Sequence, residues 1–271
     1  MNKTFQEIYS KPKENLKISD CNFYHTMDIP DIGVVDGQWD LRNNTHKILG
    51  NVDFHGKRVL DIGTASGFNC FYMEKMGADV IAYDLSEEQS WDIVPFSRFD
   101  YKNDSLWQKE QIKKLNNSFW LAHQKYNSSA RMVNGSVYDI PEEIGQVDIA
   151  VYSAILIHLR DPFLALEKGL ALTQDKVIIT GNILNSYSFP IIWSLVSLLS
   201  RFGIVLPLAI FKPDYKTHKH GVWWTLTPEI IKAFIRVLGF EDVKIKYHYS
   251  AKYMGKKKLC FTIVGQRSKI N

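Results

Sequence analysis

Residues between positions 61 and 84 have the types and spacing needed to hold a nucleoside. Gly63 and Gly67 lie at the two ends of a short turn, where glycine permits backbone angles that other residues resist. Asp84 follows this turn by about 20 residues, the separation at which a carboxylate commonly accepts hydrogen bonds from ribose hydroxyls. The pattern predicts a nucleotide site whose contacts come from Gly63, Thr64, Gly67, Asp84 and Leu85.

The acidic residue before the turn indicates which nucleotide is bound. Asp61 lies where a dinucleotide's pyrophosphate would approach, and no Lys or Arg occurs in Thr64–Asn69 to offset its charge. S-adenosylmethionine has no phosphate, and a nearby carboxylate stabilises its sulfonium and ammonium groups. Ala65 also replaces the second glycine of the dinucleotide pattern G-x-G-x-x-G. These features favour S-adenosylmethionine, with Asp61 among its contacts, over a nicotinamide cofactor. A doubly wound sheet without a cofactor is the remaining alternative.

Other candidate contacts lie at the ends of later strands. Asp139 is placed to accept a hydrogen bond from an adenine amino group, with Val137 and Tyr138 lining the ring. In the alternative interpretation, Asp139 is only a turn residue before Pro141. Ser153 ends the fourth expected strand and is assigned to the same ligand edge.

The segment Gly37–Arg42 supplies two more candidates. Arg42 could clamp a carboxylate, such as that of the methionyl group, with Trp39 beside it. In the alternative interpretation, Trp39 and Leu41 pack on the core and Arg42 is solvated.

Three side chains are candidate proton acceptors for a transfer reaction: His158, Tyr152 and His218. A base is needed only if the group that is modified is a hydroxyl or a protonated amine. His158 is equally consistent with a histidine that holds its loop in place.

Hydrophobic patterning predicts the elements that position these residues. Short apolar runs indicate strands at 58–62, 80–83, 131–134, 148–153 and 176–180, and helical spacing is found at 68–76, 118–126, 163–172 and 230–238. Alternation at 242–249 and 259–266 indicates an antiparallel hairpin, with Lys256–Lys258 in its turn. The order predicts an α/β fold: a doubly wound, Rossmann-like, mostly parallel sheet with an antiparallel last strand.

The chain divides into four parts on this pattern. Residues 1–50 are expected to form an N-terminal cap, 51–182 the nucleotide-binding core with an insertion at 86–116, 183–224 a lid, and 225–271 the helix and hairpin that complete the sheet. The apolar stretch 189–211 is broken by Arg201, Gly203 and Pro207, which disfavours an integral membrane span. Two short helices forming a lid or a homodimer face are expected there, with membrane-surface contact as the alternative.

Composition sets broad limits on partners. The net charge of +4 neither requires nor excludes an anionic partner. The three cysteines are scattered, which argues against a metal site or a disulfide framework and suits a reducing cytoplasm. The first residues lack the apolar core of a signal peptide, so a cytoplasmic location is expected.

The motif Val59-Leu-Asp-Ile-Gly-Thr-Ala-Ser-Gly67, together with Asp84, Asp139 and the segment Ile155–Pro162, resembles class I S-adenosylmethionine-dependent methyltransferases. The resemblance covers about residues 50–182. The flanks Phe23–Arg42 and Val222–Phe240 are similar to uncharacterised methyltransferases near the tRNA wobble-uridine carboxymethyltransferases. The resemblance implies that Gly63, Gly67, Asp84 and Asp139 bind the cofactor.

These observations predict methyl transfer to a small-molecule acceptor by in-line displacement from the sulfonium. The apolar character of 189–211 sets the chain apart from the tRNA enzymes. RNA remains an alternative substrate, because Lys109–Lys114, Lys212–Lys219 and Lys256–Lys258 offer basic stretches. A non-catalytic protein that binds the cofactor is the third interpretation.

Overall fold

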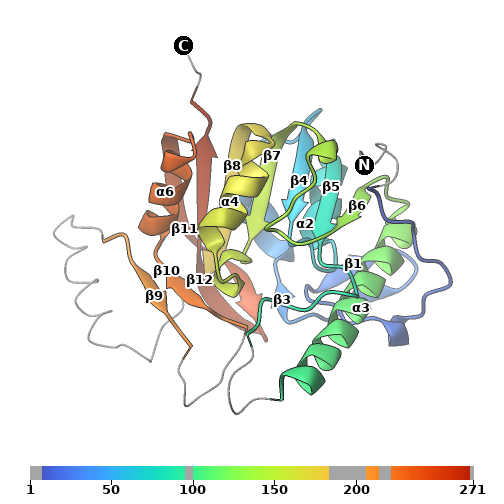
Figure 1. Cartoon of the computed structure of the whole chain (residues 1–271). Helices are drawn as coiled ribbons and strands as arrows, with labels where there is room; N and C mark the ends of the chain where they lie inside the picture. Colours follow the sequence, from blue (N-terminus) through green and yellow to red (C-terminus); the bar gives the residue numbers. More distant parts are fainter. Residues whose placement is uncertain (1–7, 95–99, 183–205, 214–220, 269–271) are drawn as a thin grey trace.

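The centre of the molecule is an eight-stranded sheet in the spatial order β3-β11-β12-β8-β7-β4-β5-β6 (Figure 1). The computed structural model describes residues 8–94, 100–182, 206–213 and 221–268. The parallel part of the sheet comprises β4 (Arg58–Ile62), β5 (Asp79–Asp84), β6 (Arg131–Asn134), β7 (Val147–Ser153) and β8 (Thr173–Asn182). The predicted doubly wound, mostly parallel fold is confirmed.

The far end of the sheet is antiparallel, as predicted. β12 (Lys256–Gln266) pairs with β8 and with β11 (Asp242–Tyr253), and β11 pairs with the short strand β3 (Trp39–Asp40). The hairpin turn lies at Met254–Gly255, where both residues have positive φ. The prediction that Lys256–Lys258 form the turn is therefore wrong, because these lysines begin β12.

The chain changes direction within the sheet at β4. It runs from β4 outward through β5 to β6, then returns to place β7 on the other side of β4. In open α/β sheets the ligand crevice lies beyond the carboxyl ends of the strands at such a switch point. The turn after β4 and the end of β7 both lie there, so Gly63 and Ser153 share one edge of the sheet.

Helices cover both faces of the sheet (Figure 1). On one face α2 (Phe68–Lys75) and α3 (Tyr101–Tyr126) pack on one hydrophobic cluster, and on the other α4 (Pro162–Ala171) and α6 (Pro228–Val237) pack on a second. The side chains of Asp161 and Thr227 cap α4 and α6 by accepting from backbone N–H groups, and each helix has proline in its first turn. These two helix starts were readable from sequence.

Helix α3 differs from the prediction. An insertion at 86–116 was expected to precede a separate helix at 118–126, but one helix of 26 residues runs from Tyr101 to Tyr126. Its buried face carries polar residues that bond to neighbouring segments: Gln108 accepts from the Trp91 N–H and Asn116 donates to the Leu85 carbonyl. Because these buried positions are polar, the hydrophobic period of the helix is hidden in its first half.

The remaining described elements are short. The N-terminal segment contains η1 (Ile18–Asp20), the hairpin β1 (Met27–Ile29) with β2 (Gly33–Val35), η2 (Arg42–Asn44) and α1 (Thr45–Ile48). η3 (Glu142–Ile144) and η4 (Leu156–His158) follow β6 and β7, and β9 (Ala209–Phe211) pairs with β10 (Trp224–Leu226). The division of the chain into a cap, core, lid and C-terminal part stays a prediction.

The expected pair of lid helices, including Arg201 and Gly203, falls mainly in 183–205, outside the described residues. The possible membrane-surface or homodimer contact of 189–211 falls largely in the same range. Within the described ranges, every helix is too short or too polar to cross a bilayer. No group of three or more potential metal-ligating side chains occurs among the same residues.

Candidate functional site

The turn after β4 is tightly packed. Gly63, Ala65 and Gly67 have φ angles of 76°, 52° and 85°, and the Gly63 N–H donates to the Tyr83 carbonyl at 2.8 Å. Ala65 therefore adopts the left-handed conformation without being glycine, which is uncommon and costs free energy. The backbone of this turn is curved tightly between β4 and α2.

Gly67 has a packing role in the structure, while its predicted contact with the cofactor stays a prediction. A Cβ at this position would lie 2.4 Å from the ring of Phe71 and 2.8 Å from that of Phe119. Glycine is thus required for α2 to pack against α3. Close approach of a ligand is not needed to explain this residue.

Asp84 closes the turn. Its Oδ2 accepts from the Ala65 N–H at 2.7 Å and its Oδ1 accepts from the Leu85 N–H at 2.8 Å. A carboxylate offers about four acceptor positions, so about two remain for ribose hydroxyls. Burial raises the pKa of Asp84, and the two backbone N–H donors oppose that rise.

A second buried carboxylate lies beside the first. Asp61 is 1% exposed, and its Oδ2 accepts from the Thr64 hydroxyl at 2.8 Å. Burial raises the pKa of Asp61 to about 7, and the nearby Asp84 acts in the same direction. Among the described residues neither carboxylate forms an ion pair. The turn therefore presents uncompensated negative potential, which suits a cationic ligand and disfavours a phosphate.

The predicted adenine edge is only partly as expected. Val137 is buried in the hydrophobic cluster under α4, and the Tyr138 hydroxyl donates to Asp92 and accepts from the Asp161 N–H. Their side chains are thus engaged with the protein. The Asp139 N–H donates to the Ser136 carbonyl at 2.9 Å, while its carboxylate accepts from no described residue. Contact of Asp139 with adenine stays a prediction.

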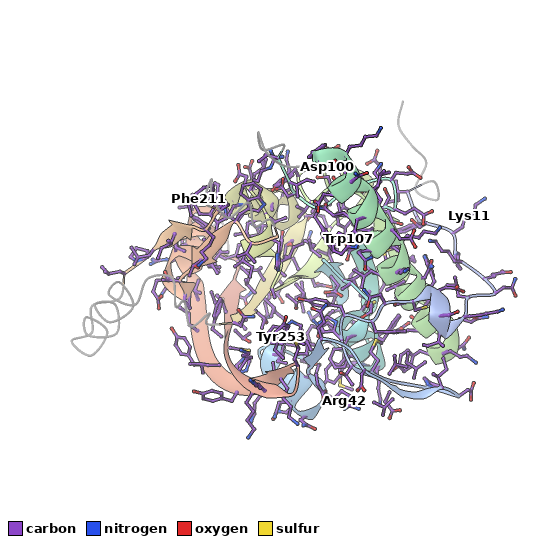
Figure 2. All side chains as sticks on the ribbon, turned by 90° about the horizontal axis from the view of Figure 1, so that it is seen from below. Lys11, Arg42, Asp100, Trp107, Phe211 and Tyr253 are labelled. Atoms are coloured by element: carbon purple, nitrogen blue, oxygen red, sulfur yellow. The ribbon has the colours of Figure 1, made fainter. Side chains whose placement is uncertain are left out.

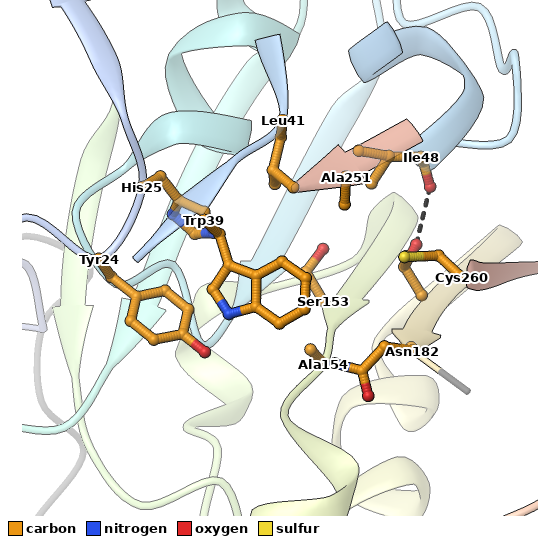
Figure 3. Close-up of a pocket in the computed structure, with 12 residues that line it drawn as sticks. Tyr24, His25, Trp39, Leu41, Ile48, Ser153, Ala154, Asn182, Ala251 and Cys260 are labelled. Atoms are coloured by element: carbon orange, nitrogen blue, oxygen red, sulfur yellow. Dashed lines mark hydrogen bonds between the residues drawn. The ribbon is translucent and has the colours of Figure 1, made fainter. Parts of the chain in front are cut away.

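A pocket of about 440 Å3, including space open to solvent, lies beside the end of β7 (Figure 3). Three parts of the chain line it: the N-terminal segment, the carboxyl ends of β7 and β8, and the β11–β12 hairpin. The lining residues are Tyr24, His25, Trp39, Leu41, Ile48, Ser153, Ala154, Thr180, Gly181, Asn182, Ala251 and Cys260. Figure 3 shows the Trp39 indole between Tyr24 and Ser153.

Two buried polar residues of this region were missed by sequence reasoning. Asn69 in α2 is 3% exposed and donates from Nδ2 to the Ser153 Oγ at 2.9 Å, which joins the glycine turn's helix to the pocket wall. His25 is 7% exposed, its Nδ1 has no partner among the described residues, and burial lowers its pKa to about 4. Neither residue belongs to a spaced motif, so the sequence contained no signal for them.

The three candidate bases have different outcomes in the structure. Tyr152 is fully buried and its hydroxyl donates to the Ala165 carbonyl of α4 at 3.0 Å, so its prediction as a base is wrong. Burial raises the pKa of Tyr152 far above neutrality. The Nδ1 of His158 bonds to the Gly221 carbonyl and burial lowers its pKa, an arrangement that supports the loop-holding interpretation. His218 lies outside the described residues.

Of the two candidates in the segment Gly37–Arg42, only Trp39 lines the pocket. The Arg42 guanidinium forms a double contact with Asp40, at 2.9 Å to Oδ1 and 3.0 Å to Oδ2, and it does not line the pocket. Figure 2 shows Arg42 at the rim of the molecule. The pairing with Asp40 supports the alternative in which Arg42 is solvated, and contact of Arg42 with the cofactor's carboxylate stays a prediction. Trp39 does line the pocket and packs on the Tyr253 ring, with ring centroids 4.9 Å apart.

The comparisons with known proteins agree with this architecture. Residues 37–204, well over half of the chain, match a family described as "Methyltransferase domain". The comparison with curated proteins found no match. Similar solved structures include a magnesium protoporphyrin IX methyltransferase from Synechocystis with bound SAH, which is 12% identical with a TM-score of 0.51; 84% of this chain and 82% of that chain are covered.

Two further structures show the same fold. The Burkholderia thailandensis 1,6-didemethyltoxoflavin-N1-methyltransferase, with its substrate and S-adenosylhomocysteine bound, is 15% identical with a TM-score of 0.51, over 84% of this chain and 78% of that one. A SAM-dependent methyltransferase from Methanosarcina mazei is 14% identical with a TM-score of 0.50. The match covers 84% of this chain and 98% of that chain. At such identities the likeness concerns the fold. The match over residues 37–204 shows the family: this chain belongs to the methyltransferase domain family.

Proposed function

We propose that the protein transfers a methyl group from S-adenosylmethionine to a small molecule held in the pocket beside Ser153. The observation that carries this proposal is the pair of buried carboxylates, Asp61 and Asp84, without a cationic partner among the described residues. They flank the glycine turn at the switch point of a methyltransferase fold. The enzyme class predicted from the sequence is confirmed by the family match.

The residues of the turn fit the cofactor in two ways. Asp84 has acceptor positions left for ribose hydroxyls, and Asp61 adds negative potential that favours the cationic methionyl end. When bound, S-adenosylmethionine supplies an electrophilic methyl group on sulfur. The pocket residues then hold the acceptor in line with that methyl group and exclude water.

The proposed ribose contact is tested by calorimetry with S-adenosylmethionine and S-adenosylhomocysteine. Asp84→Asn keeps the shape of the side chain but removes its charge and one acceptor oxygen. We expect its affinity for both ligands to fall about tenfold or more. The matched control is Asp31→Asn, because Asp31 is exposed and lies outside the turn. If Asp84→Asn binds both ligands with unchanged affinity, Asp84 does not hold the ribose.

Catalysis is tested separately from binding. Release of S-adenosylhomocysteine is measured over a panel of small hydroxyl- and amino-bearing acceptors. Binding of the cofactor without turnover on any of them would favour the non-catalytic interpretation over an enzyme.

RNA modification, including the carboxymethyltransferase-like activity suggested by the flanking segments, is the second candidate. Its support is a group of lysines at the hairpin tip, where Lys252 faces Lys257 across the β11–β12 ladder, close to the pocket residue Ala251. Phosphate contacts make such binding strongly salt-dependent. A gel shift with tRNA at low and at physiological salt decides between the two substrates.

A further inference from the structure

The pocket beside Ser153 has no charged side chain in its lining. None of its lining residues is Asp, Glu, Lys or Arg. Its one histidine, His25, is neutral at pH 7, because burial lowers its pKa to about 4. An ionised group placed in such a pocket would lose its hydration without gaining a counter-charge, which is costly.

Two buried polar atoms in the lining lack a partner among the described residues. They are the Nδ1 of His25, from the N-terminal segment, and the Oδ1 of Asn182, from the end of β8. Other polar groups of the pocket wall are already engaged: the Thr180 hydroxyl donates to the Ile48 carbonyl at 2.7 Å, and the Ser153 Oγ accepts from Asn69. Buried polar atoms left without hydrogen bonds are few in folded proteins, so each of these two atoms calls for a partner.

The rest of the lining is apolar or aromatic. Tyr24 and Trp39 contribute two aromatic rings, and Leu41, Ile48 and Ala251 contribute aliphatic side chains. Aromatic walls favour flat ring systems, which stack on them.

We propose that the acceptor is an uncharged, flat, largely apolar molecule with a hydroxyl or N–H group that donates either to the Asn182 Oδ1 or to the His25 Nδ1. The Oδ1 of Asn182 can only accept, so the ligand must carry a donor. The neutral His25 ring accepts at Nδ1 when its proton is on Nε2. This assignment rests on the proposed function, because it treats the pocket as the acceptor's site.

The probes are three compounds with one ring system: 2-naphthol as the neutral donor, naphthalene as the ring alone, and 2-naphthoate as the anion. Their binding to the full protein, saturated with S-adenosylhomocysteine, is measured by equilibrium dialysis. We expect 2-naphthol to bind about tenfold or more tightly than either of the other two. Binding of S-adenosylhomocysteine is measured first by calorimetry. If S-adenosylhomocysteine does not bind, the proposed function is refuted, and the probes are then tested in the absence of S-adenosylhomocysteine.

Two variants locate the donor contact. His25→Phe and Asn182→Leu remove the accepting atoms and preserve the approximate size of the side chains. The variant that removes the accepting atom is expected to weaken 2-naphthol binding about tenfold, and both variants are expected to leave naphthalene binding within about twofold of the unchanged protein. His46→Phe, an exposed histidine on α1, is the matched control and is expected to change neither.

Three results would overturn the inference. They are equal binding of 2-naphthoate and 2-naphthol, equal losses for 2-naphthol and naphthalene in the two variants, and no binding of any naphthalene compound. If cofactor binding is normal in any of these cases, the pocket's proposed chemistry is wrong and the proposed function stands.

Discussion

At the residue scale, the two carboxylates of the glycine turn are held in different ways. Asp84 receives two backbone N–H bonds, whereas Asp61 receives only the Thr64 hydroxyl and is fully buried. Desolvation disfavours the charged form of both, and the hydrogen bonds oppose it more effectively at Asp84. Asp61 is therefore the group that titrates near neutral pH, and a bound cation would favour its ionised form.

This difference predicts a pH-dependent affinity for S-adenosylmethionine. The pKa of Asp61 in the unbound protein is raised to about 7, so the residue is mostly protonated at pH 5 and must release that proton to meet the cation. Affinity should rise by up to about tenfold per pH unit from pH 5 and level off above about pH 7. Calorimetry across this range measures it.

The control for this titration is Asp61→Asn. It keeps an acceptor for Thr64 but cannot ionise, so its affinity should be weak and nearly constant from pH 5 to 7. A sloped profile in the variant, or a flat one in the unchanged protein, would assign the titration to another group.

At the scale of elements, the glycine turn is shaped by the helices that pack behind it. Gly67 precedes α2, and its missing side chain lets the rings of Phe71 and Phe119 stack, with centroids 5.2 Å apart. The position of α2 in turn places Asn69 against Ser153. Packing between α2 and α3 thus connects the cofactor edge to the pocket.

Gly67→Ala should therefore destabilise the protein strongly. The added Cβ would meet three ring atoms of Phe71 and Phe119 within 3 Å at a φ of 85°, and overpacking with backbone strain together cost roughly 2–4 kcal/mol. Gly33→Ala is the matched control, because Gly33 has a φ of 89° but nothing within 4 Å of its Cβ position. It should lose only about 1 kcal/mol, the strain alone. Chemical unfolding of both variants measures the difference, and equal losses would contradict the packing argument.

At the scale of the whole molecule, the two ends of the chain are joined at the pocket. β3 pairs with β11, with Trp39 opposite Tyr253 and Asp40 opposite Lys252. The N-terminal segment also contacts the glycine turn, because the His25 N–H donates to the Ser66 hydroxyl at 3.4 Å. The pocket consequently forms only when segments about 200 residues apart in the sequence fold together. Its contacts therefore have a high contact order.

Trp39→Ala should destabilise both the N-terminal segment and the β11–β12 hairpin. Loss of a half-buried indole that packs on Tyr253 costs roughly 2 kcal/mol. Amide hydrogen exchange should accelerate in residues 24–41 and also in 251–260, while β4 and β5 stay protected. Val34→Ala, at an exposed position of β2, is the control. An effect confined to the N-terminal segment would show that the two ends fold independently.

Much of the core could be predicted from patterns that are local in the sequence. The strands 58–62 and 131–134 were predicted with their observed bounds, because a short apolar run between turn signals specifies a buried strand. The helix starts at Asp161-Pro and Thr227-Pro were predicted for a similar reason, since capping is a contact within one turn. The first half of α3 was missed, because its buried polar residues find partners in a distant loop.

The sequence alone determined the fold class, the glycine turn and the positions of Asp61 and Asp84, because each depends on residues close together in the chain. Only the tertiary structure decided which candidate side chains meet. It buried Tyr152 under α4, paired Arg42 with Asp40 and placed His25 and Asn182 in one pocket. Burial and hydrogen-bond partnership are properties of the surroundings of a side chain. Those surroundings come from segments that are remote in the sequence, so residue type and spacing do not specify them.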